Sequence, residues 1–432
     1  MDHLIVKKYL QDHSLVESNI TSFNNFVEQR MQEIVEDIQE TINNEDFEIT
    51  LGKIKLGTPE ITEADGSSSL IMPSDARLRK LTYSAPITLE LTVKKEDQVD
   101  SEVVEIGRIP IMVRSKYCNT SGLSKDELIA NYQDPADPGG YFIIKGNERV
   151  MVLAEDLAEN QSFIETNAKG ELTLKMFSSK GTYRIPAIIS EDKTGLFEIG
   201  FSRFKNLPAI VLLKALGLTK ESEIAKHIGK ETDSVIVNLY EFVNLATTED
   251  AMMYIAEKTN LQGTKKEILD RVKQRIDSYL LPHIGVGKEN RIKKAITLCK
   301  LIKQYLTSKN NPDLRTDKDH YANKRVRLSG DLLSTLFRVN LSILIRDVQY
   351  SLQKSAKRKK FFSIKIIAKS TLFSHRVESA IATGSWTGER SGITQNMDKT
   401  NYLATISQLQ RVSSMLPSDQ ENFMARTLHP TH

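Results

Sequence analysis

The sequence is poor in cysteine. It has two, Cys118 and Cys299, among 432 residues. A disulfide framework or a structural zinc site needs about four ligands at short spacings, so the count excludes both. Each thiol is expected to be a small buried side chain in a reducing compartment.

Long apolar runs are also missing. The longest, such as Leu341–Ile345, fall far short of the roughly 20 residues that a membrane helix needs. The first residues, MDHLIVKKYLQDHSLVE, contain no apolar signal-peptide core and no A-x-A-like cleavage site. We therefore expect a cytoplasmic protein with no membrane segment. The chain is 40% apolar and 27% charged, which is ordinary for a globular protein, and its length predicts a few domains.

The motifs of the common enzyme classes are absent. A P-loop requires G-x-x-x-x-G-K-[ST], whereas the glycine-rich residues 285–288 are followed by Glu289 instead of a hydroxyl side chain. There is no H-E-x-x-H and no cluster of His and Cys with zinc spacing. His429 and His432 are three apart, but Pro430 lies between them. We expect no catalytic residue, no metal site and no cofactor in this chain.

Charge is unevenly distributed. The net charge is +3, yet from Lys309 onward there are 20 basic and 10 acidic residues, whereas residues 1–308 carry 39 basic and 46 acidic residues. A basic C-terminal quarter on an acidic body is typical of a localised polyanion-binding surface. A solvated charged face of a helical segment explains the same counts, and charge alone does not decide between the two.

Hydrophobic periodicity changes along the first half of the chain. Within residues 1–44, apolar side chains recur at steps of three and four, which predicts an amphipathic helix. From Phe47 the pattern alternates, as it does in a half-buried strand. Leu81–Val93 is also rich in strand signals, and Val103–Val113 predicts a further pair of strands. Residues 45–155 are therefore expected to form a mostly β module.

The second half combines strands and helices. Residues 156–308 are predicted to be α+β, with strands at 171–176, 183–189 and 196–201 and helices at 208–216, 265–279 and 293–306. Residues 310–313, Asn-Asn-Pro-Asp, are the clearest linker. Beyond it, Leu332–Leu352 shows a strong helical stripe, and a last helix is expected over Tyr402–Val412.

The most specific motifs lie in the last fifty residues. They read GSWTGERSG at 384–392, TQNMD at 394–398, LATISQLQR at 403–411 and RTLHPTH at 426–432. Three earlier motifs accompany them: DARLRKLTY at 75–83, IGRIPIMVRSK at 106–116 and GGYFIIKGNE at 139–148. Taken in order over nearly the whole chain, these motifs resemble the second-largest subunit of multisubunit DNA-dependent RNA polymerases, in its archaeal and eukaryotic form.

The resemblance implies an α+β multidomain fold. Residues 1–155 and 309–373 would form a β-rich protrusion with helices, residues 156–308 an inserted α+β lobe, and residues 374–432 a fork region of helices and loops. Chains of the family normally continue for several hundred residues beyond the His-Pro-Thr-His. We expect the missing part to be a separate chain, as in the divided archaeal form, with an engineered truncation as the alternative.

The resemblance also implies a role in transcription. The chain would form one side and the roof of the active-centre cleft and contact template DNA and the RNA–DNA hybrid. Its partners would be the largest subunit, the chain that completes the second-largest subunit, the other polymerase subunits and the transcript. The family's Mg²⁺ is held by D-x-D-x-D on another chain; the nearest pattern here, Asp317-Lys-Asp319, is followed by Tyr321. The alternative is a stand-alone nucleic-acid-binding or regulatory protein derived from a polymerase fragment.

Eight residues are the candidates for nucleic-acid contact: Lys324, Arg325, Arg327, Arg390, Gln395, Asp398, Arg411 and Arg426. The first three are close enough in sequence to bind phosphate together. A positively charged helix start or an intersubunit salt bridge would explain them equally well.

Within the fork motifs, the resemblance assigns RNA contact to Gln395. Asp398 and Arg411 either contact nucleic acid or form an internal ion pair that shapes the loop. Trp386 is expected to be a packed anchor, with stacking on a base as the alternative. The family often has a second basic residue beside Arg411, and this chain has Gln410 and a valine at those positions.

Overall fold

The computed structural model describes most of the chain. The described residues are 4–6, 8–9, 13–39, 48–63, 66–95, 98–166, 170–180, 183–229, 233–261, 263–357, 370–386, 391–413 and 430–431. They fall into two compact units. The first is drawn from Met1–Asp156 and Val326–Arg426, and the second from Leu157–Arg325 and Thr427–His432. The finer, four-part division expected from the sequence stays a prediction.

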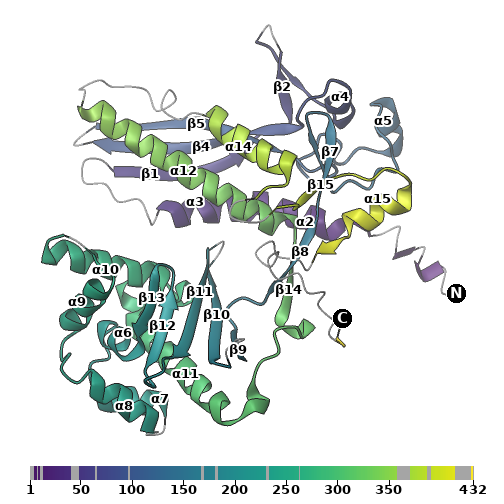
Figure 1. The fold of residues 1–432 in the computed structure, drawn as a ribbon. Helices are drawn as coiled ribbons and strands as arrows, with labels where there is room; N and C mark the ends of the chain where they lie inside the picture. The colour runs from purple at the N-terminus through teal and green to yellow at the C-terminus, as the bar shows by residue number, and fades with distance from the viewer. Residues whose placement is uncertain are drawn as a thin grey trace. The chain divides into compact units, whose positions relative to one another are not determined.

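The first unit contains helices and several small sheets (Figure 1). Its elements up to the first boundary are α2 (Glu17–Asn25), the π-helical turn η1 (Phe26–Arg30), α3 (Met31–Gln39), β1 (Glu48–Leu56), β2 (Glu60–Thr62), β3 (Ser68–Leu70), α4 (Pro73–Leu78), β4 (Ser84–Lys95), β5 (Gln98–Pro110), α5 (Lys125–Ala130), β6 (Phe142–Ile144), β7 (Asn147–Met151) and β8 (Leu153–Leu157). Those after the second boundary are β14 (Lys324–Arg327), α12 (Ser329–Lys357), α14 (Ser370–Thr383), β15 (Thr394–Asn396), α15 (Tyr402–Leu409) and β16 (Val412–Ser413). The chain passes from the first unit to the second within β8, and returns to the first unit within β14.

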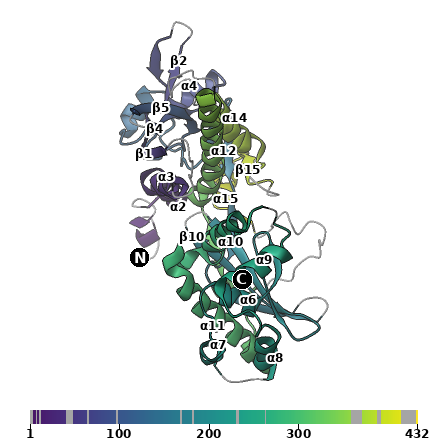
Figure 2. The same ribbon diagram turned by 90° about the vertical axis from the view of Figure 1, so that its left-hand side faces the viewer.

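A three-stranded antiparallel sheet of order β1-β4-β5 carries the core of this unit. Alternation along β4 buries Ile87, Leu89 and Leu91 completely or nearly so, which is the reason the segment folds as a strand. Helix α14 packs on β5 and α3 on β1, and α12 lies beside α14 in both views (Figures 1 and 2). The Phe337 ring of α12 meets Phe373 of α14 edge-on at 5.7 Å between centroids.

Two expectations for this unit need correction. The N-terminal helix is interrupted, because η1 inserts a wider turn that brings Phe23, Phe26 and Met31 to the core together. The pair of strands expected over residues 103–113 is a single strand, β5, paired with β4 along its length. Its register shifts beside Gly107, and such a bulge breaks the alternation so that one strand reads as two.

The second unit is an antiparallel five-stranded sheet, of order β13-β12-β11-β10-β9, with helices packed on it. Its elements are β9 (Ser162–Thr166), β10 (Leu172–Lys180), β11 (Tyr183–Glu191), β12 (Phe197–Phe201), β13 (Phe204–Pro208), α6 (Ala209–Ala215), α7 (Glu221–Ile228), α8 (Asp233–Glu241), α9 (Thr248–Lys258), α10 (Lys265–Tyr279), η2 (Pro282–Ile284), η3 (Lys288–Asn290), α11 (Arg291–Asn310), η4 (Pro312–Leu314) and η5 (Tyr321–Asn323). Helix α6 is buried on all sides, which explains its unbroken run of apolar residues. The α+β character expected from the sequence is confirmed.

Both cysteines are free and buried, as predicted. Cys118 belongs to the core of the first unit and Cys299, on α11, to the core of the second. Burial raises the pKa of the Cys299 thiol to about 12. No helix in the described ranges is both long and apolar enough to cross a bilayer.

Candidate nucleic-acid interface

The candidate residue Gln395 lies on a strand with a buried foundation. Its strand, β15, pairs with β7, where Gln395 is opposite Val150, and β7 pairs with the fully buried β6. The preceding residue, Thr394, points inward and donates from Oγ1 to the carbonyl of Ile381 at 2.6 Å. Because side chains alternate along a strand, the half-buried Gln395 points to the opposite face.

The loop after β15 is folded by its own polar groups. The Asp398 carboxylate accepts hydrogen bonds from the Oγ1 (2.7 Å) and the backbone N–H (2.9 Å) of Thr400, and these lower its pKa. Gln408, on α15, donates to the carbonyl of Asn396 at 2.8 Å and accepts from the Asp398 N–H at 2.7 Å. Asp398 is thus engaged by Thr400. Among the described residues it forms no ion pair with Arg411, so that alternative is wrong for this structure.

Helix α15 leads from this loop to Arg411. Its N-cap, Asn401, accepts from the N–H of Ala404 at 2.7 Å. The helix buries Ile406 and Leu409. It ends at Leu409, so the helix expected up to Val412 is too long.

The early end of α15 has a cause in the neighbouring strand. The N–H of Leu153 donates to the carbonyl of Arg411 at 3.0 Å, which draws the chain alongside β8 in parallel pairing. The N–H of Arg411 donates to the carbonyl of Gln408 at 3.2 Å. The backbone of Arg411 is therefore held on both sides, and its side chain is exposed.

The cationic cluster is on a strand. β14 pairs with β8, on the opposite side from β16, so the helix-start interpretation is wrong. Arg327 places its Nε 3.4 Å from the buried carboxylate of Asp156 on β8, which holds its side chain close to the sheet. Strands from two distant parts of the chain thus bring Arg327 and Arg411 to either side of β8.

Lys324 and Arg325 belong to the second unit. Arg325 is exposed, and its Nη1 donates to the carbonyls of Lys324 (2.7 Å) and Ala322 (3.0 Å). In the same segment, the N–H of Asp319 donates to the carboxylate of Asp317 at 2.8 Å, which makes this pair of acids a turn. In the part of the chain that the structure describes, no group of three or more His, Cys, Asp or Glu side chains could hold a metal ion.

Two of the eight candidates, Arg390 and Arg426, lie outside the described residues. So do residues 414–423, most of the segment Ser413–Phe423 whose position in the chain resembles that of the family's second fork loop. Trp386 is described and is 5% exposed. Its indole Nε1 donates to the carbonyl of Leu332 on α12 at 2.9 Å. The prediction of a packed anchor is confirmed.

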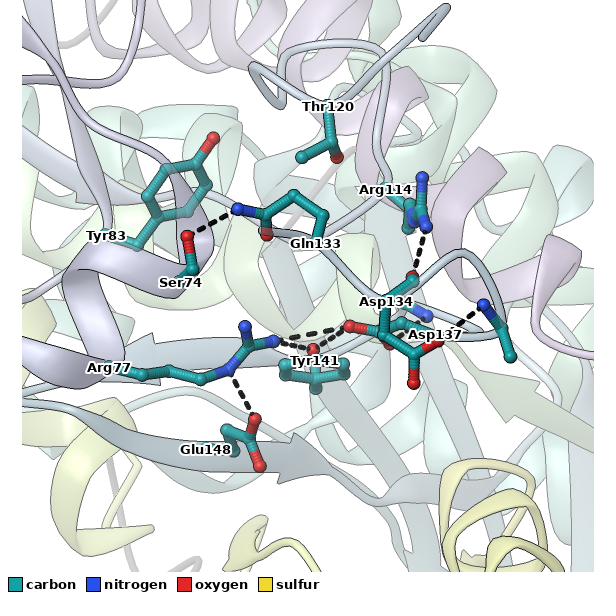
Figure 3. A network of polar contacts seen from close by, with 12 residues as sticks. Ser74, Arg77, Tyr83, Arg114, Thr120, Gln133, Asp134, Asp137, Tyr141 and Glu148 are labelled. Carbon is teal, nitrogen blue, oxygen red and sulfur yellow. Dashed lines mark hydrogen bonds and ion pairs between the residues drawn. The ribbon is translucent and has the colours of Figure 1, made fainter. Parts of the chain in front are cut away.

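Sequence reasoning missed a partly buried polar network centred on Arg77 (Figure 3). Arg77 donates from Nε to Glu148 at 2.6 Å and from Nη2 to the Tyr141 hydroxyl, which in turn donates to Asp137. Burial alone would lower the pKa of Arg77. Tyr141, Glu148 and Asp137 outweigh this effect, and the pKa of the guanidinium is raised overall. The guanidinium is therefore a permanent cation that joins α4, β7 and the turn at Asp137 before β6.

Glu148 extends this network to the candidate interface. Its second carboxylate oxygen lies 2.5 Å from Nζ of Lys399, next to Asp398, and its carbonyl accepts from the N–H of Met397 at 3.0 Å. Arg77 and Glu148 each occur in a motif quoted above, so the motifs were noticed. What the sequence did not reveal is that the two motifs meet in space.

Comparison with known proteins identifies the family of the chain. A family model described as "RNA polymerase beta subunit" matches residues 14–375, and one described as "RNA polymerase Rpb2, domain 3" matches residues 395–432. The second match begins at Gln395, so it covers α15 and Arg411.

Three of the curated relatives, all archaeal, are similar over almost the whole of this chain. The DNA-directed RNA polymerase subunit Rpo2N of Methanocaldococcus jannaschii is 38% identical, over 99% of this chain and 89% of the relative. Rpo2N of Halobacterium salinarum is 37% identical, over 98% and 86%. The undivided Rpo2 of Saccharolobus solfataricus is 37% identical, and this chain spans 39% of its length. The chain therefore belongs to the family of second-largest, β-type subunits of DNA-directed RNA polymerase, in the archaeal form that Rpo2N represents.

Proposed function

We propose that this chain is part of a DNA-dependent RNA polymerase core, in which it forms one side and the roof of the active-centre cleft. The observation that carries the proposal is the arrangement at β8: an exposed arginine, Arg411, on a backbone fixed by Gln408 and Leu153. A cation presented on a rigid support suits contact with a phosphate backbone, which carries charge but no base information. Gln395, on the neighbouring segment, is a neutral donor and acceptor for the RNA strand.

The chemistry would be two-metal nucleotidyl transfer, carried out by the assembled enzyme. We place its Mg²⁺ on other chains, because the acids nearest to the family's metal pattern, Asp317 and Asp319, are engaged in a turn. This chain would contribute binding: it would hold template DNA and the RNA–DNA hybrid while the bond forms elsewhere.

The partners that follow are the largest subunit, the chain that completes the second-largest subunit and the other polymerase subunits, in the cytoplasm. The names of the relatives favour this over a stand-alone nucleic-acid-binding or regulatory protein derived from a polymerase fragment. Purification of the native complex tests the choice.

Native mass spectrometry of this chain, purified from its own cells at moderate salt, should show it in a complex with several larger and smaller partners. An intact polymerase core contains many subunits, so the mass should far exceed the 48.8 kDa of the chain. A single species at that mass would contradict the proposal and leave the polymerase relationship as ancestry.

In the assembled enzyme, Arg411→Ala should shorten the lifetime of elongation complexes and reduce its dependence on salt. Loss of one phosphate contact lowers the slope of log stability against log salt by roughly one unit. Gln395→Ala should shorten the lifetime with no change of slope, because the lost contact is neutral. The measurement is complex dissociation across a series of salt concentrations.

The control for these variants is Lys53→Ala, which removes an exposed cation from β1, outside the fork segment. It should leave lifetime and slope unchanged. Circular dichroism of each chain before assembly excludes unfolding as the cause. Wild-type lifetimes for both Arg411→Ala and Gln395→Ala would contradict the assignment of these residues to nucleic acid.

A further inference from the structure

The end of α15 is tied to helix α2 and to Leu15, just before that helix, almost four hundred residues earlier in the chain. Asn19 donates from Nδ2 to the carbonyl of Leu409 at 3.2 Å. Gln410 donates from Nε2 to the carbonyl of Leu15 at 2.8 Å. The two bonds run in opposite directions between the same two segments, and they engage the two residues that immediately precede Arg411.

These ties complete the support of Arg411. Its N–H bonds the preceding helical turn and its carbonyl bonds Leu153 on β8. Leu409 is held by Asn19 of α2, and Gln410 is held by Leu15 just before that helix, so the chain on the N-terminal side of Arg411 is also anchored to a second segment. What remains free is the arginine side chain, so its direction depends on where α2 lies.

Helix α2 is itself rigidly placed. Asn19 is 3% exposed, and its carbonyl accepts from the Ser329 hydroxyl at 3.1 Å. The Ser22 hydroxyl accepts from the N–H of Gly330 at 3.1 Å. The Phe23 ring packs edge-on against Phe142 of β6. The same helix therefore supports the start of α12 and the end of α15.

The side chain of Asn19 is unusual for a packing residue. Its Oδ1 is buried and has no hydrogen-bond partner in the described structure. A buried acceptor without a partner costs free energy, and an apolar residue of the same shape would avoid that cost. The amide is therefore poorly suited to stability alone, while its Nδ2 makes the bond to Leu409.

We infer that Asn19 and Gln410 are positioning residues for Arg411, through which the N-terminal helix controls a phosphate contact that it does not touch. This inference rests on the proposed function of Arg411. It also gives a role to Gln410, which occupies a position where the family often has a second basic residue: here the side chain is used to hold the chain.

The test is a double-mutant cycle in the assembled polymerase. Gln410→Met removes the donor while keeping the length of the side chain, and Asn19→Leu keeps the shape while removing both the donor and the unpaired oxygen. Each should shorten the lifetime of elongation complexes, by roughly three- to tenfold for one lost hydrogen bond. Each should also reduce the slope of log complex stability against log salt concentration, as is expected for Arg411→Ala. A merely structural role would leave the slope unchanged.

The cycle separates the inference from the proposed function. In an Arg411→Ala background, Gln410→Met and Asn19→Leu should have no further effect, because the residue that they position is gone. Ser407→Met, an exposed position one turn earlier on α15, is the matched control and should behave as wild type.

Two outcomes would overturn the inference. In the first, Arg411→Ala shortens the lifetime, but Gln410→Met and Asn19→Leu either have no effect or shorten it as much in the Arg411→Ala background as in the wild type. The phosphate contact would then exist, but these two residues would not position it. If Arg411→Ala itself leaves lifetime and slope unchanged, the proposed contact fails and the inference falls with it.

Discussion

Replacing Arg77 by methionine should lower the free energy of unfolding by about 3 kcal/mol or more. The side chain is one of the most heavily engaged in the protein: it meets Glu148, Tyr141 and Asp137 at once (Figure 3). Chemical denaturation of the full-length chain, followed by circular dichroism, measures the change.

The size of the effect follows from what the substitution leaves behind. The side chain of Glu148 is 8% exposed and that of Asp137 is 17% exposed, so neither carboxylate is fully hydrated once the guanidinium has gone. Glu148 keeps its pair with Lys399, whereas the partners left to Asp137 among the described residues are neutral donors, Tyr141 and the N–H of Gly139. Removing one partner of a buried pair costs more than the pair contributes, because a buried charge remains.

A neighbouring arginine provides the control. Arg79 makes two hydrogen bonds to Glu63, at 2.8 and 3.0 Å, but half of its side chain is exposed. Arg79→Met removes the same charge and should cost far less, because water replaces the partner. Adding Asp137→Asn to Arg77→Met should recover part of the loss. Equal losses for the two arginines would show that burial does not determine the strength of this network.

Local patterns predicted the elements of this fold well. The alternation of β4, the stripe of α12 and the limits of α10 were all read from apolar spacing, because each element buries one side. The same reasoning missed the bulge at Gly107 and the π turn η1. Each inserts an extra residue, which shifts the spacing of the apolar side chains along the element. In the sequence such a shift looks like the end of one element and the start of another.

The site was less predictable, because its geometry comes from contacts distant in sequence. The fork motifs pointed to Gln395 and Arg411 through family resemblance. No periodicity could show that Asn19 would hold the end of α15, or that Lys399 would pair with Glu148. Charge likewise marked Lys324–Arg327 as a cluster, but only the pairing of β14 with β8 shows that these residues form a strand.

The second large effect is expected at Gly330, the second residue of α12. Helix propensity alone predicts that Gly330→Ala is favourable by about 1 kcal/mol. A β-carbon at this position would lie 2.1 Å from the carbonyl oxygen of Ser22 and 2.7 Å from its carbonyl carbon. These are backbone atoms of α2, so no rotation of a side chain can relieve the clash. The substitution should therefore destabilise the chain, by about 3 kcal/mol as the two helices are forced apart.

Whether Gly330→Ala raises or lowers the free energy of unfolding shows which effect dominates, the helix propensity of the residue or its contact with α2. Gly200→Ala on β12 is the matched control: its added β-carbon would meet the carbonyl oxygen of Phe204 at an ordinary 3.7 Å, so stability should change little. If Gly330→Ala is instead neutral or stabilising, α2 and α12 are less tightly apposed than the structure shows. If it destabilises as expected, amide exchange should rise in α2 and at Leu153 as well, because Asn19 ties the same helix to the end of α15. The close approach at Gly330 would then be one condition for the position of Arg411.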